Sequence, residues 1–228
     1  MDEPVKRRYR SPLREESARR TRAQIRDAAA RLFVRQGYAV TTMREIADEA
    51  EVSERTTYLA FPTKLDLLLE VIGVSTSGDD HPIPLARRPE FQAALAARDG
   101  KQALELTVSF AAALLERAGP LVMAAYESAG AEKALREAAM QGERARAQDL
   151  GLVAKALAAN GQLREGLAVD DATDILFSVL SPQTHQMFRV VRKRSAARYE
   201  RTALEVLERA LLRATNRGST QPPKEKST

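Results

Sequence analysis

Apolar positions recur at intervals of three and four residues along most of the chain, which places them on one face of a helix. Runs of alternating β-branched residues bounded by turn residues, the usual signature of strands, are nearly absent. The pattern therefore predicts an all-α protein. The clearest stripe lies in the N-terminal part and consists of Ile25, Ala28, Ala29, Leu32 and Phe33.

Each of the four helices predicted within residues 21–72 opens on a hydroxyl side chain that can cap it. These caps are Thr21, Thr42, Ser53 and Thr63. After the three threonines, a Gln, Glu or Asp follows at the third position and can return a hydrogen bond to the cap residue. Gly37 is expected to end the first helix and Pro62 the third.

The rest of the chain reads as further helices separated by Gly- and Pro-containing breaks. Gly73 to Arg88 is predicted to be a loop. Helices are predicted at about 89–98, 101–118, 120–159, 170–192 and 196–215. The 120–159 segment fits one helix or two, since Gly130, Gly142 and Gly151 weaken it. The expected domains are a flexible basic arm (1–20), a helix-turn-helix domain (21–64), a larger helical domain (65–215) and a disordered tail (216–228).

Two short helices separated by a three-residue turn occupy residues 42–61. Small Ala47 and Ala50 allow the backbones to approach closely, and Ile46 and Val52 are apolar at matching positions. The spacing is that of a helix-turn-helix, although a generic pair of helices in a helical protein is partly similar.

The amino-acid composition excludes several kinds of functional site. The 228 residues include no Cys and only two His, which excludes disulfide scaffolds, thiolate metal sites and cysteine nucleophiles. Residues 1–35 carry eleven Lys and Arg against five Asp and Glu, and residues 187–228 eleven against four. Basic ends on a chain of net charge +5 favour a polyanionic partner, nucleic acid ahead of membrane. A solvated Arg-rich surface is the alternative.

A membrane location is not expected. The longest apolar stretch, at about 65–74, is interrupted by Asp66 and Glu70, and no run reaches the roughly 18 residues of a span. The N-terminus is charged, unlike a secretory signal. An intracellular, cytoplasmic protein is predicted.

The segment TTMREIADEAEVSERTTYLAFPTKLDLLLEVI, preceded by TRAQIRDAAARLFVRQGYAV, resembles the DNA-binding region of the TetR family of bacterial transcriptional regulators. The resemblance covers about residues 21–72. The matching positions are Phe33, Gly37-Tyr38, Thr41-Thr42, Ile46-Ala47, Val52-Ser53, Thr56, Tyr58, Phe61 and Lys64. It implies a ligand-responsive repressor that binds a near-palindromic double-stranded DNA operator as a homodimer.

The resemblance makes the helix after Ser53 the recognition helix in the major groove. Arg55 can donate to guanine, Thr56 can contact a thymine methyl or a phosphate, and the Tyr58 hydroxyl can reach a phosphate. The two helix caps Thr42 and Ser53 can hold phosphates, as can Arg44 and Lys64. The alternatives are capping alone for the two caps, core packing for Tyr58 and a plain surface position for Lys64.

Three features depart from the family pattern. Glu51 stands in the turn where members usually have Gly, so a left-handed conformation there would cost roughly 1–2 kcal/mol. Leu59 and Ala60 replace basic or aromatic contacts, and Glu51 and Glu54 add negative charge. The N-terminal arm, with Lys6, Arg7, Arg8 and Arg10 around Tyr9, can compensate in an adjacent minor groove or be a disordered tail.

The resemblance assigns dimerisation to the helices at about 170–192 and 196–215. Their apolar stripes, whose alternative is an intramolecular core, are Ile175, Leu176, Val179, Leu180 and Phe188, then Leu204, Leu207, Leu211 and Leu212. Candidate contacts for a small-molecule effector, each also suited to core packing, are Phe110, Leu114, Met123, Tyr126, Phe177 and His185. Effector binding would act by shifting the helix at 65–73.

An enzyme is not expected, because no Gly-rich phosphate loop, serine nucleophile elbow or metal-ligand cluster is recognisable. Asp170, Asp171 and Asp174 sit at a predicted helix start, where the helix dipole accounts for them. No cofactor or metal is predicted. The alternative function is a helical protein-interaction module that lacks sequence-specific DNA binding.

Overall fold

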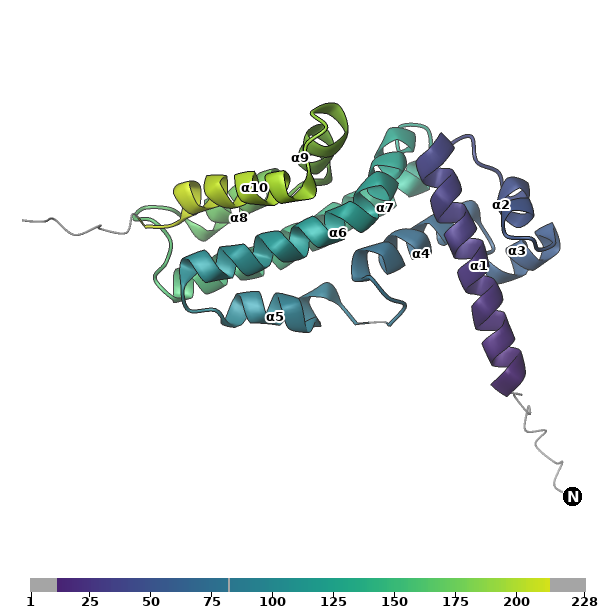
Figure 1. The fold of residues 1–228 in the computed structure, drawn as a ribbon, viewed down its shortest axis with the longest axis horizontal. Coiled ribbons are helices and arrows are strands. Elements are labelled where there is room, and N and C mark those ends of the chain that lie inside the picture. The colour runs from purple at the N-terminus through teal and green to yellow at the C-terminus, as the bar shows by residue number, and fades with distance from the viewer. Residues whose placement is uncertain (1–11, 82, 214–228) are drawn as a thin grey trace, which may run out of the picture. The chain divides into compact units, whose positions relative to one another are not determined.

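The computed structural model describes residues 12–81 and 83–213, and within them every regular element is a helix (Figure 1). The prediction of an all-α fold is confirmed. The α-helices are α1 (Pro12–Gln36), α2 (Met43–Glu49), α3 (Glu54–Ala60), α4 (Lys64–Ser77), α5 (Pro89–Ala96), α6 (Gly100–Ser128), α7 (Lys133–Ala159), α8 (Val169–Val179), α9 (Pro182–Gln186) and α10 (Ala196–Leu211). A 3₁₀ turn (η1, Leu85–Arg87) and a π-helical turn (η2, Met187–Val191) complete the order.

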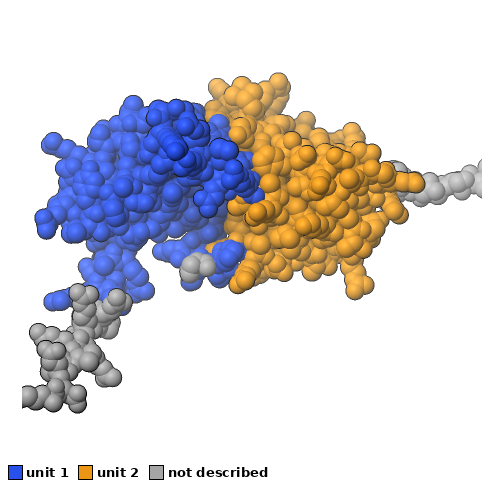
Figure 2. All heavy atoms as spheres, turned by 180° about the vertical axis from the view of Figure 1, so that it is seen from behind, with its two compact units in different colours: residues 1–84, 113–144 blue, residues 85–112, 145–228 orange. Residues whose placement is uncertain are grey.

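The chain divides into two compact units (Figure 2). Unit 1 consists of residues 1–84 and 113–144, and unit 2 of residues 85–112 and 145–228. Unit 1 therefore contains α1 to α4, and α6 and α7 each contribute one part to either unit.

The core of unit 1 is the apolar stripe of α1 packed against α2, α3 and α4. The five stripe residues predicted from the sequence are all buried, with exposures of 0–3%. The partners in this core are Tyr38, Met43, Ile46, Ala50, Phe61, Leu67, Leu68, Val71, Leu121, Ala125 and Leu135. A single core thus holds the helix-turn-helix against the helix that follows it.

The predicted caps after residue 40 are confirmed. Thr42 and Thr63 each form a complete capping box, with Glu45 and Asp66 respectively, and Ser53 caps α3 by accepting from the Thr56 amide. Phe61 ends α3 in extended backbone, as expected of a residue that precedes proline.

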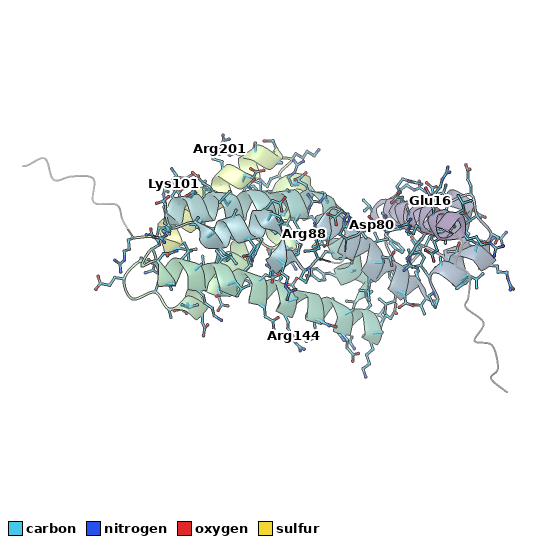
Figure 3. All side chains as sticks on the ribbon, turned by 90° about the horizontal axis from the view of Figure 1, so that it is seen from below. Glu16, Asp80, Arg88, Lys101, Arg144 and Arg201 are labelled. Atoms are coloured by element: carbon cyan, nitrogen blue, oxygen red, sulfur yellow. The ribbon has the colours of Figure 1, made fainter. Side chains whose placement is uncertain are left out.

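The predicted start of the first helix at Thr21 is wrong, because α1 begins at Pro12. Proline is favourable at the first position of a helix, and the following Arg and Glu residues are good helix formers. The first turns, including Glu16 (Figure 3), are fully solvent-facing: residues 13–20 are exposed. Residues 1–11 of the predicted arm lie outside the described residues.

Two further predicted breaks are displaced. α4 continues to Ser77 and ends at Gly78, which is left-handed at φ 83°, so the predicted loop starts five residues later. α6 runs through Gly119-Pro120 without interruption. Its buried face continues across the proline, from Ala118 to Leu121, and this packing outweighs the lost backbone hydrogen bond. The actual break falls at Gly130, and α7 accommodates both Gly142 and Gly151.

Unit 2 contains the C-terminal helices. The helix predicted at 170–192 is in fact α8, α9 and the π-helical η2, because Ser181 caps a new helix whose first residue is Pro182. α10 packs on α8. Leu176, Leu207 and Leu211 are fully buried within the single chain, so these stripe positions belong to an intramolecular core.

Among residues 12–81 and 83–213, one helix, α6, is long and apolar enough to cross a membrane by length and composition alone, with mean hydropathy 1.4 over an 18-residue window. Its apolar residues are interrupted by polar ones, so uninterrupted apolar runs in the sequence give no sign of this property. Core helices of soluble proteins have the same property, and 44% of this window is buried inside the protein.

Candidate nucleic-acid interface

The turn between α2 and α3 closes through a left-handed Glu51. Its φ is 55°, as anticipated for the position where a glycine is expected. The amide of Val52 donates to the carbonyl of Ala47 (3.0 Å) and that of Glu51 to Asp48 (3.2 Å). This pair of hydrogen bonds is a Schellman motif, which ends α2 and aims the chain at the Ser53 cap.

The strain at this turn predicts a stabilising substitution. Glu51→Gly should raise the free energy of unfolding by about 1 kcal/mol, because glycine adopts the left-handed conformation without the Cβ penalty. Urea denaturation followed by circular dichroism measures the change. Asp48→Gly, in the right-handed interior of α2, is the matched control and should lower stability by a similar amount. A destabilised Glu51→Gly protein would contradict this reading of the turn.

The exposed face of α3 is centred on Arg55 and Leu59. Thr57 is completely buried and anchors the opposite face. Arg55 is exposed and has no ion pair or hydrogen bond with another residue of 12–81 or 83–213. Tyr58 is 47% exposed, so its ring is not a core side chain. The side chains predicted to contact DNA from this helix are therefore accessible.

The hydroxyl groups at the helix starts already have partners. The amide and the Oγ1 of Thr42 both donate to Glu45 Oε2, at 2.8 and 2.9 Å. These hydrogen bonds, the backbone one first, lower the pKa of Glu45. Ser53 Oγ lies 2.7 Å from Thr56 Oγ1. A phosphate at Thr42 would have to share these donors with a carboxylate.

Lys64, for which a phosphate contact is predicted, is bound to backbone carbonyls within unit 1. Its Nζ donates to the carbonyls of Tyr38 (2.8 Å), Ala39 (3.3 Å) and Thr41 (2.9 Å), which uses all three N–H bonds. The ammonium also lies 4.3 Å from the centre of the Tyr38 ring. Burial lowers the pKa of Lys64, while Glu132 and Glu45 act in the opposite direction. Lys64 therefore fixes the loop that leads into α2.

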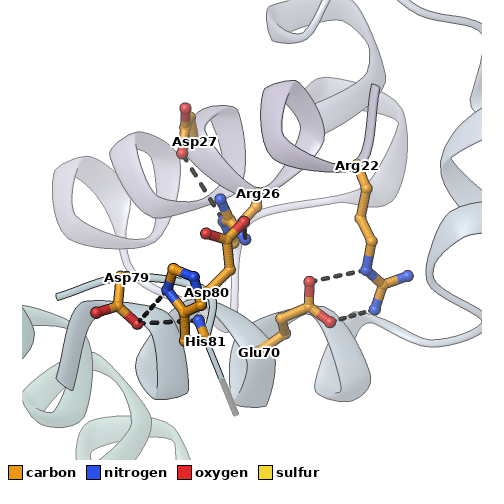
Figure 4. Close-up of polar contacts among 7 residues, drawn as sticks. All are labelled: Arg22, Arg26, Asp27, Glu70, Asp79, Asp80 and His81. Carbon is orange, nitrogen blue, oxygen red and sulfur yellow. Dashed lines mark hydrogen bonds and ion pairs between the residues drawn. The ribbon is translucent and has the colours of Figure 1, made fainter. Parts of the chain in front are cut away.

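Arg22 connects three elements of unit 1 and was not singled out from the sequence. From α1, it pairs with both carboxylate oxygens of Glu70 on α4, with Nε 2.8 Å from Oε1 (Figure 4). It also donates to the carbonyl of Ala60, the last residue of α3, and its guanidinium carbon lies 4.0 Å from the centre of the Phe61 ring. The C-terminal end of α3 is thus tied to α4. Sequence spacing gives no signal for a contact across 48 residues.

The predicted effector contacts lie in separate packing environments. In unit 2, Phe110 packs edge-on against Phe91, the Phe177 ring lies 3.5 Å from the Arg146 guanidinium carbon, and buried His185 packs edge-on against Tyr199. In unit 1, the hydroxyl of Tyr126 donates to Glu143, and Met123 and Leu114 are half-buried. These contacts give each aromatic candidate a structural role.

A groove of about 550 Å³ lies within unit 1, and none of the predicted effector contacts lines it. One wall is α1, which contributes Arg19, Arg22 and Arg26, and the other is the end of α4 with the loop after it. Asp80 on that loop lies 3.5 Å from Arg26 (Figure 4). The groove is lined by both charged and apolar side chains, the apolar ones being Ala23, Val74, Ile83 and Pro84.

Residues 12–81 and 83–213 contain no group of three or more His, Asp or Glu side chains that could hold a metal ion.

The N-terminal helices α1 to α4 are similar to part of a known protein family. Residues 25–71, which run from the buried stripe of α1 into α4, match the sequence profile of the bacterial regulatory proteins of the tetR family. The resemblance to the TetR family of bacterial transcriptional regulators is therefore found in this segment of the chain. Thr42, Ser53 and α3 all lie within this matching segment.

A curated relative and two of the matching solved structures show the extent of the similarity. The HTH-type transcriptional repressor KstR of Mycobacterium tuberculosis is 38% identical over 63 residues, which are 28% of this chain and 29% of KstR. The chain thus matches less than a third of that relative's length. Two solved structures share the fold over most of the chain. The SmeT–triclosan complex has a TM-score of 0.67 and 18% sequence identity, and the match covers 92% of this chain and 100% of the other. NalD, the secondary repressor of the MexAB-OprM multidrug efflux pump in Pseudomonas aeruginosa, has a TM-score of 0.65 and 21% identity, and the match covers 87% of this chain and 100% of the other.

Proposed function

We propose that the protein is a ligand-responsive repressor that binds a near-palindromic operator as a homodimer in the cytoplasm. The observation that carries the proposal is the outward face of α3, where Arg55 is exposed and has no partner among the described residues. A guanidinium in that position can donate two of its N–H groups to guanine O6 and N7 in the major groove. Thr56 and Tyr58 flank it.

Residues on both sides of Arg55 can contact the phosphates of the DNA backbone. Arg44 is exposed on α2 and has no ion pair among residues 12–81 and 83–213. Thr42 and Ser53 stand at the N-terminal ends of α2 and α3, where helix dipoles favour anions. Glu45, Glu51 and Glu54 oppose DNA in the same region, so the arginines have to outweigh them.

Dimerisation through the C-terminal helices supplies the second recognition helix. Two-fold symmetry places the two copies of α3 about 34–36 Å apart, which is one turn of the duplex. Both copies can then enter successive major grooves on the same face of the DNA. Val206 on α10 is 44% exposed, which supports a partner for the outer face of this helix. A single α3 of seven residues makes few contacts, and pairing two gives useful affinity.

A small-molecule effector would release the DNA by moving α4. The Arg22–Glu70 pair joins α4 to α1, and the same guanidinium holds the C-terminal carbonyl of α3. A shift of α4 therefore pulls on the end of the recognition helix. The SmeT structure contains triclosan, which supports a hydrophobic small molecule as the chemical class of effector.

The proposal is tested by selecting binding sites for the full chain from randomised duplexes and measuring their affinity at several salt concentrations. A regulator should enrich an inverted repeat, and the logarithm of its affinity should fall linearly with the logarithm of salt. Enrichment of no sequence, with weak retention of every duplex, would instead support the protein-interaction module.

A further inference from the structure

The outward face of α3 carries an apolar side chain next to Arg55. Leu59 is 75% exposed, compared with 47% for Tyr58 one residue earlier. Arg55 and Leu59 are each two residues from the buried Thr57. At about 100° per residue, each lies about 160° around the helix from Thr57, so the two share the outermost strip of α3. Among apolar side chains of this helix, none within the described range is more exposed.

Within residues 12–81 and 83–213, the outward position of Leu59 is not explained by packing in a core. The core of unit 1 excludes it, and neighbouring Ala60 is packed against that core. In the major groove, the one apolar group on a base edge is the C5-methyl of thymine. A leucine can bury that methyl, whereas it leaves the polar edges of guanine, cytosine and adenine without partners.

We propose that Leu59 is a specificity-determining residue that reads a thymine methyl in each operator half-site. The proposal rests on the proposed function, because it requires α3 to enter the major groove. Leu59 follows Arg55 by one helical turn, about 6 Å along the axis. With a rise of about 3.4 Å per base pair, the thymine lies within about two base pairs of the guanine that Arg55 contacts.

Deoxyuridine substitution tests the proposal directly, since uracil differs from thymine only by the methyl group. In the selected operator, each symmetry-related pair of thymines is replaced by deoxyuridine, one pair at a time. One pair near the Arg55 guanine should weaken binding of the full chain by about fourfold per half-site, or about 15-fold for both. The other pairs should change affinity by less than about twofold.

The Leu59→Ala variant supplies the second arm. Leu59→Ala should bind the thymine operator as weakly as the wild type binds the operator with deoxyuridine at the sensitive pair. Deoxyuridine at that pair should not weaken the binding of Leu59→Ala further. Leu69→Ala is the matched control, because Leu69 is 42% exposed on α4, and it should retain the wild-type pattern. Thermal denaturation should give the same melting temperature for Leu59→Ala as for the wild type.

Each other outcome overturns a distinct claim. If an operator is selected but no deoxyuridine pair affects wild-type binding, Leu59 reads no methyl group. If the effect persists in Leu59→Ala, another side chain reads that methyl. If no operator is selected, the proposed function itself fails, and the inference fails with it.

Discussion

Arg55→Ala should weaken operator binding by at least about 30-fold and leave the fold unchanged. A bidentate arginine–guanine contact contributes about 1–3 kcal/mol of base discrimination, and the homodimer makes the contact in both half-sites. Arg55 is exposed and has no partner in the described parts of the chain, so its removal costs little stability. Titration of labelled operator measures the affinity, and circular dichroism checks the helix content.

The loss should be specific to the operator. Binding to unrelated duplexes depends on phosphate contacts and not on the arginine–guanine contact. It should therefore fall much less than operator binding. Arg144, exposed on α7 (Figure 3), provides the control, and Arg144→Ala should bind like the wild type. Tyr58→Ala should lose roughly 1–3 kcal/mol of specific binding energy. Wild-type affinity in both α3 variants would show that the recognition helix has been misplaced.

Lys64→Met should lower the free energy of unfolding by about 2–3 kcal/mol, because it removes three charge-assisted hydrogen bonds from a half-buried position. The carbonyls of Tyr38, Ala39 and Thr41 would lose their common donor. Methionine preserves an unbranched apolar stem as far as the ε position and lacks only the terminal ammonium, so the loss is assigned to that group. Chemical denaturation measures the change.

The salt dependence of operator binding separates this anchoring role from a phosphate contact. Lys64→Met should leave the slope of log affinity against log salt unchanged, since Nζ binds carbonyls and not DNA. Lys133→Met, at an exposed lysine paired with Glu137, is the control and should change stability by less than about 0.5 kcal/mol. Unchanged stability with a slope reduced by about two, one phosphate per subunit, would restore the phosphate contact expected from the sequence.

The local signals of the sequence were sufficient for the helix-turn-helix. Thr42, Ser53 and Thr63 cap helices because their hydroxyl groups satisfy amides within the next turn, which depends on no distant residue. The left-handed conformation of Glu51 was suggested by the resemblance, because the family usually has glycine at this turn position. Exposed positions on α3 follow from its period once Thr57 is assigned to the core.

Features that depend on distant packing could not be predicted in the same way. Pro120 breaks isolated helices, but α6 continues because apolar side chains on both sides of it are buried. Lys64 was expected at the surface, yet it reaches carbonyls 23 to 26 residues away. The Arg22–Glu70 pair likewise depends on how α1 and α4 pack. The exposed helical turns before Thr21 were missed because charge and proline were read as disorder.

Methylation interference on the selected operator is the most direct test of the central claim that α3 reads base edges in the major groove. Methylation of guanine N7 modifies the major-groove edge that Arg55 is proposed to contact. The account predicts that binding is blocked by methylation of one guanine in each half-site, the two lying about 10 base pairs apart or a multiple of that distance. Interference confined to minor-groove positions, or absent from both half-sites, would contradict it.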